Sequence, residues 1–84
     1  MVAAAPLTQA LALLRSGRAA EARQILDRLL AQEPRNADAL QLAGMARRQT
    51  GDLEGAVALF RRSLAVAPAQ PHVCRNLGNA LQAL

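Results

Sequence analysis

Aromatic residues are almost absent from this chain of 84 residues, which has one Phe and neither Trp nor Tyr. β-Branched residues are also few, so the composition argues against a sheet. The single Cys excludes an intrachain disulfide and suits a reducing compartment. We expect Cys74 to be a small apolar packing residue, because a reactive thiol needs surroundings that stabilise its thiolate.

Motifs for catalysis or metal binding are missing as well. The sequence contains no Gly-rich phosphate loop, no serine elbow and no metal-ligand spacing. The one histidine, His72, lies two residues before Cys74, and residues two apart on a helix point in different directions. The sequence therefore predicts no catalytic residue, no cofactor and no metal, and it argues against an enzyme within these residues.

Lysine is absent too: all ten basic residues are Arg, and the net charge is +4. A positive chain attracts nucleic acid, but these arginines are scattered and no aromatic residues are available to stack on bases. Nucleic acid is therefore an improbable partner, and Arg without Lys is also what GC-rich coding produces. No apolar run is long enough to span a membrane and no targeting segment is recognisable, so we expect a cytoplasmic protein without membrane contact.

What the chain does have is a period of 34 residues. Small residues, Leu and Pro recur at this spacing, which marks a solenoid whose repeats bury their apolar faces against one another. The pairs are Gly17 and Gly51, Ala22 and Ala56, Leu30 and Leu64, Pro34 and Pro68, Gly44 and Gly78, and Ala46 and Ala80.

Each repeat is predicted to contain two helices. Gly51 can adopt positive φ after a helix, and Asp52 is a good N-cap for the next one. Pro68 ends a helix, whereas Pro71 suits the first position of another. Small residues within helices need a packing reason, so Gly44 and Gly78 are expected to let helices approach closely. The predicted helices span residues 7–15, 19–32, 37–50, 53–66 and 71–84.

This pattern resembles the tetratricopeptide repeat (TPR). The resemblance implies an all-α solenoid of antiparallel helix pairs that forms a right-handed superhelix, with repeats at about 3–36 and 37–70 and the first helix of a third at 71–84. Pro6, Gln9 and Arg47 depart from the family pattern. The residues at structural positions of the family are Leu40, Gly44, Gly51, Ala56, Phe60, Pro68 and Gly78.

The resemblance also implies a concave groove, lined by the first helix of each repeat, for a peptide or partner protein. Leu7, Leu11 and Leu42 stand where chaperone-binding members of the family carry a carboxylate clamp, so no such clamp is expected. The groove residues implied by the family pattern are Gln41, Met45, Arg48, His72, Arg75, Asn76 and Asn79.

Two apolar stripes indicate contacts outside the repeats. Both have spacing i, i+4, i+7, which places each on one helix face. They consist of Leu7, Leu11 and Leu14 near the start, and of Leu77, Leu81 and Leu84 at the end.

Three functions are therefore open. The leading one is a protein-interaction module that presents a groove. The chain could also be the N-terminal recruiting segment of a larger enzyme, such as a sulfotransferase or glycosyltransferase. The third is self-association, as a weak homodimer through the exposed apolar ends.

Overall fold

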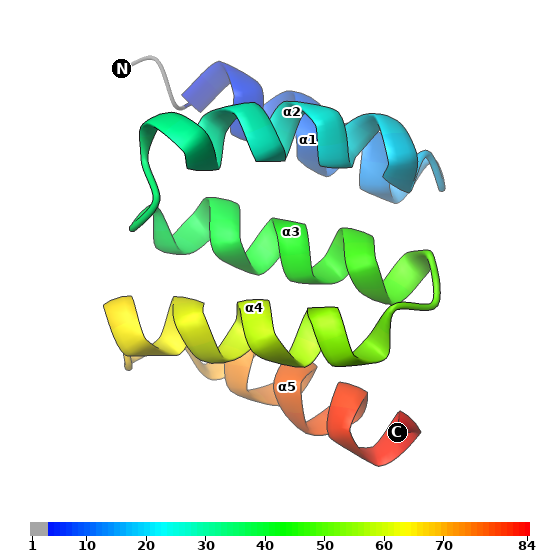
Figure 1. Ribbon diagram of the computed structural model, residues 1–84, viewed down its shortest axis with the longest axis vertical. Coiled ribbons are helices and arrows are strands. Elements are labelled where there is room, and N and C mark those ends of the chain that lie inside the picture. The colour runs from blue at the N-terminus through cyan, green and yellow to red at the C-terminus, as the bar shows by residue number, and fades with distance from the viewer. Residues whose placement is uncertain (1–3) are drawn as a thin grey trace.

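The computed structural model describes residues 4–84, which form five helices joined by short turns (Figure 1). No strand is present in this part of the chain, as the all-α prediction requires. The helices are α1 (Ala4–Arg15), α2 (Ala19–Gln32), α3 (Ala37–Gln49), α4 (Leu53–Val66) and α5 (Pro71–Ala83).

The turns follow from local sequence. Gly17 and Gly51 adopt φ of +77° and +88°, a region that side chains disfavour, so glycine suits the end of each first helix. The Asn36 Oδ1 accepts a hydrogen bond of 3.0 Å from the Ala39 amide and caps α3. The Asp52 Oδ1 accepts one of 2.9 Å from the Gly55 amide and caps α4, as predicted.

Arg47, one of the departures from the family pattern, has a role in a turn. Its side chain is half-buried and its Nη1 lies 3.1 Å from the Asp52 Oδ2. The Gly55 amide and the Arg47 guanidinium together hold the pKa of Asp52 below its ordinary value of 3.8. Arg47 therefore supports the turn between α3 and α4 rather than the apolar core.

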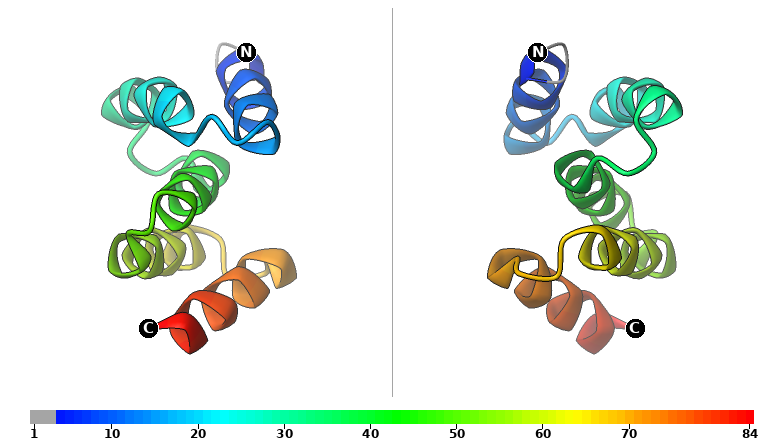
Figure 2. Two further views of the ribbon diagram at one scale, coloured as in Figure 1. Left: turned by 90° about the vertical axis from the view of Figure 1, so that its right-hand side faces the viewer. Right: turned by 90° about the vertical axis from the view of Figure 1, so that its left-hand side faces the viewer.

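The helices stack in two rows. Viewed along the helices, α1, α3 and α5 lie on one side and α2 and α4 on the other (Figure 2). The third helix contacts all four others, whereas the backbones of α2 and α4 do not approach each other closely. This arrangement confirms a helical solenoid of helix pairs.

The largest fully buried side chain of the described residues is that of Phe60, which is 0% exposed. A Cβ added at Gly44 would lie 2.5 Å from the Phe60 ring, so α3 and α4 approach closely only because Gly44 has no side chain. Ala22 and Ala56 are also fully buried. The thioether of Met45 packs against both apolar clusters, one around α1 to α3 and the other around α4 and α5.

A buried polar link joins α3, α4 and the start of α5. The Ser63 hydroxyl donates to the Ala37 carbonyl oxygen at 2.8 Å. The Gln70 Nε2 donates to the Ser63 hydroxyl at 3.1 Å and to the Ser63 and Ala67 carbonyl oxygens at 3.0 and 2.6 Å. Carbonyl groups at a helix end have no partner within the helix, so Gln70 satisfies the end of α4. Nothing in the sequence had indicated this link.

Three expectations for the helices are corrected. The first helix begins at Ala4, not at residue 7, because Pro6 falls in its first turn, where a missing amide hydrogen costs nothing. Gly78 has nothing within 4 Å of an added Cβ, so it permits no close approach. Cys74 is exposed instead of packed, because no described helix covers that side of α5. The predicted start of the first repeat, residue 3, lies outside the described residues.

Candidate protein-interaction surface

The predicted groove residues all lie on α3 and α5, two of the three helices that form one side of the stack. We call the side formed by α1, α3 and α5 the inner face. Gln41, Met45, Arg48 and Asn76 are half-buried, while His72, Arg75 and Asn79 are exposed.

The inner face is hollowed between α1 and α3. The hollow has a volume of about 240 Å³. Its apolar part comes from leucines of both helices and its polar part from a threonine, an aspartate and a glutamine. The Gln41 side chain is held along α3, because its Nε2 donates to the Met45 Sδ at 3.0 Å. The lining residues are Leu7, Thr8, Leu11, Asp38, Gln41 and Leu42.

Leu14 departs from its predicted role in an apolar contact stripe. Its side chain is only 3% exposed and belongs to the core around α1 to α3. Its carbonyl oxygen accepts a hydrogen bond of 2.9 Å from the Gln49 Nε2, which ties α1 to α3. Leu7 and Leu11 are half-buried and line the hollow, so only these two members of the stripe are open to a partner.

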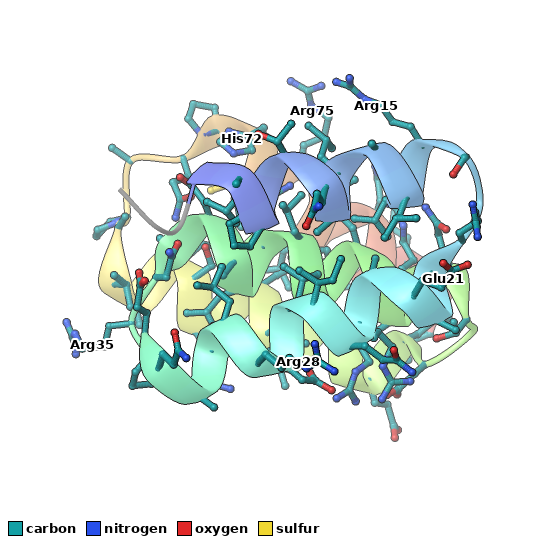
Figure 3. All side chains as sticks on the ribbon, turned by 90° about the horizontal axis from the view of Figure 1, so that it is seen from above. Arg15, Glu21, Arg28, Arg35, His72 and Arg75 are labelled. Atoms are coloured by element: carbon teal, nitrogen blue, oxygen red, sulfur yellow. The ribbon has the colours of Figure 1, made fainter. Side chains whose placement is uncertain are left out.

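Charge is distributed unevenly between the two rows of helices. The helices of the inner face carry four arginines and one carboxylate, Asp38. The outer helices, α2 and α4, also carry four arginines, but these are accompanied by three carboxylates. Figure 3 shows Arg15, His72 and Arg75 projecting on the side of α1 and α5, away from Arg28 of α2.

Most inner-face arginines have no carboxylate partner. The ion pairs within residues 4–84 are Arg18 with Glu21, at 2.7 Å, and Arg47 with Asp52, at 3.1 Å. Arg15, Arg48 and Arg75 therefore form no ion pair with any described residue. Of these, Arg15 and Arg75 are exposed and Arg48 is half-buried, so all three can reach a ligand.

The C-terminal end of α5 carries uncovered apolar side chains. Leu81 is 43% and Leu84 60% exposed, the largest exposed apolar side chains of the described residues. Leu77 is half-buried against the cluster around Phe60, so the predicted second stripe is only partly accessible.

A second open hollow lies between α1 and α2. It has a volume of about 440 Å³. In the described part of the chain, no group of three or more His, Cys, Asp or Glu side chains is arranged to hold a metal. None of the five helices is long and apolar enough to cross a membrane. The residues that line the hollow between α1 and α2 are Gln9, Ala12, Leu13, Ser16, Arg18 and Ile25.

Comparisons with known proteins agree with this architecture. A family model described as tetratricopeptide repeat matches residues 7–71. Two curated relatives, both named cellulose synthase operon protein C, come from Komagataeibacter sucrofermentans and Komagataeibacter xylinus. Each is 40% identical over 68 residues, which cover 79% of this chain and 5% of the relative. On the family match and the helix-pair stack, this chain belongs to the tetratricopeptide repeat family.

Proposed function

We propose that the inner face is a groove that receives a segment of a partner protein. Tetratricopeptide repeats are non-catalytic modules that generally mediate protein–protein interaction. The observation that carries the proposal is the hollow between α1 and α3, where Leu7, Leu11 and Leu42 lie beside Asp38 and Gln41. An apolar floor with a few polar groups to fix orientation is the usual composition of a binding site.

Binding would be located with a peptide selected from a random library displayed on phage. We expect this peptide to shift the backbone amide resonances of α1, α3 and α5 in nuclear magnetic resonance spectra and to leave those of α2 and α4 nearly unchanged. Shifts concentrated on α2 and α4 would contradict the proposal, because those helices form the opposite row.

A matched pair of glutamine substitutions tests the same surface by affinity. Gln41→Ala removes a hydrogen-bonding group from the hollow and should weaken the peptide about fivefold, the equivalent of one hydrogen bond. Gln24→Ala removes an exposed glutamine from α2 and should leave affinity unchanged. Isothermal titration calorimetry gives the dissociation constants of both variants. Equal losses of affinity would show that the hollow is not the binding site.

A second proposal is that the module recruits a substrate or partner for a larger protein. It is supported by the relatives, of which the matched segment covers only 5%. Such a role uses the same inner face, so it differs from the first proposal in what the rest of the protein does. Activity of a full-length enzyme that falls when Gln41 is changed would support it.

Self-association is a third candidate, favoured by exposed Leu81 and Leu84 on α5. Because uncovered apolar surface promotes association, we expect the chain to dimerise weakly at high concentration. Sedimentation velocity over a concentration series should show this, and Leu81→Glu should abolish it. Ala58→Glu, at an exposed position of α4, is the control for added charge. A monomer at every concentration would contradict the expectation.

A further inference from the structure

The chemistry of the partner segment follows from the arginines of the inner face. Arg15, Arg48 and Arg75 form no ion pair with a described residue, and the three inner helices carry only one carboxylate, Asp38. Arginine binds carboxylates through paired, charge-assisted hydrogen bonds, which are stronger than hydrogen bonds between neutral groups. A segment that bears carboxylates therefore complements this face, whereas a basic one is repelled.

The positive groups are spread along the long axis of the molecule. Figure 3 is a view down this axis, and in it Arg15 and Arg75 project on the same side although α1 and α5 lie at opposite ends of the stack (Figure 1). The molecule is 33 Å long in this direction. An extended chain advances about 3.3 Å per residue, so roughly ten residues reach from one end to the other.

The hollow between α1 and α3 supplies an apolar anchor point. Leu7, Leu11 and Leu42 are among its lining residues, and an aliphatic side chain that displaces water from them gains the free energy of apolar burial. No basic side chain lines this hollow, and Asp38 is among its lining residues. The hollow therefore disfavours the terminal carboxylate of a peptide, because like charges repel.

The outer helices provide an internal comparison. They have as many arginines as the inner ones, but Glu21, Asp27 and Glu54 lie on the same two helices and reduce the net positive charge of that row. The excess of positive charge is thus a property of the inner face and not only of the chain as a whole.

Resting on the proposed function, we infer that the inner face binds an extended internal segment of a partner protein that carries several Asp or Glu residues and an aliphatic residue. The aliphatic side chain occupies the hollow between α1 and α3. The carboxylates pair with Arg15, Arg48 and Arg75 along the length of the stack.

Selection from a random twelve-residue peptide library tests the composition of the ligand. We expect the enriched peptides to be rich in Asp and Glu and to share a Leu, Ile or Val. A synthetic copy with an amidated C-terminus should bind as well as one with a free carboxylate. Replacing its Glu residues by Gln should weaken binding by roughly tenfold or more. Each tenfold loss of affinity corresponds to the loss of about one charge-assisted hydrogen bond.

Paired arginine variants of the full chain test the site. Arg48→Ala with Arg75→Ala should weaken the selected peptide by roughly tenfold or more. Arg61→Ala with Arg62→Ala, both exposed on α4, should change affinity less than about twofold. None of these four arginines forms an ion pair with a described residue, so thermal unfolding followed by circular dichroism should be the same for both variants.

Several results would overturn the inference. Neutral or basic peptides that shift only the resonances of α1, α3 and α5 would refute the acidic ligand and leave the groove itself intact. Selection that enriches no peptide would refute both the acidic ligand and the groove. Equal losses from the two arginine pairs, with a steep dependence on salt, would indicate nonspecific binding of polyanions such as nucleic acid.

Discussion

Phe60→Ala is expected to lower the free energy of unfolding by about 3–5 kcal/mol, the usual cost of removing a fully buried aromatic side chain. Phe60 is the largest fully buried side chain of the described residues and fills the space above Gly44. Its neighbours cannot collapse into the vacated volume easily, because their positions are fixed by both α3 and α4. Urea denaturation followed by circular dichroism measures the loss.

Phe60→Leu is the control for this substitution, since it retains part of the buried volume and should cost less. A loss below about 1 kcal/mol for Phe60→Ala would mean that the ring contributes little to the core. The residue would then be available to a ligand, contrary to its exposure of 0%.

The second large effect is that alanine should change stability in opposite directions at two glycines that occupy the same place in the repeat. Gly44→Ala should destabilise the protein by about 1–3 kcal/mol, because its Cβ would lie 2.5 Å from the buried Phe60 ring. Gly78→Ala should stabilise it by about 0.5–1 kcal/mol, because alanine favours a helix interior more than glycine does. An added Cβ at Gly78 has nothing within 4 Å.

A double substitution isolates the contact that causes this difference. Leucine is narrower than phenylalanine, so Gly44→Ala should cost less when Phe60 is already Leu than in the natural protein. Chemical denaturation of the four proteins gives the coupling energy. If Gly44→Ala and Gly78→Ala change stability in the same direction, the close approach of α3 and α4 at Gly44 does not constrain the fold.

The number, order and approximate ends of the helices were predictable from sequence. Those features depend on local physics: Gly51 tolerates positive φ, Asp52 and Asn36 cap the helices that follow, and Pro71 suits a first helical turn. The period of 34 residues added the pairing of helices, because a repeat that cannot bury its own apolar face must stack on the next.

Residues at equivalent places in two repeats were expected to be buried alike. This expectation is wrong where burial depends on a neighbouring helix. Leu40 and Cys74 are 34 residues apart, yet Leu40 is buried and Cys74 exposed, because α4 covers α3 and no described helix covers the same side of α5. Leu14 was assigned to an outward stripe by its spacing alone. The position of α3 places it in the core instead.

Part of the candidate site was likewise predictable from sequence, and part was not. Family resemblance indicated that first helices line a groove, and the stack places α1, α3 and α5 in one row. The hollow between α1 and α3 and the buried link from Gln70 to Ser63 could not be read from the chain. Sequence determined the helices of this protein, because caps, turns and propensities act within a few residues. The tertiary structure decided which side chains are buried and where the surface is hollow, because these depend on contacts between residues distant in sequence.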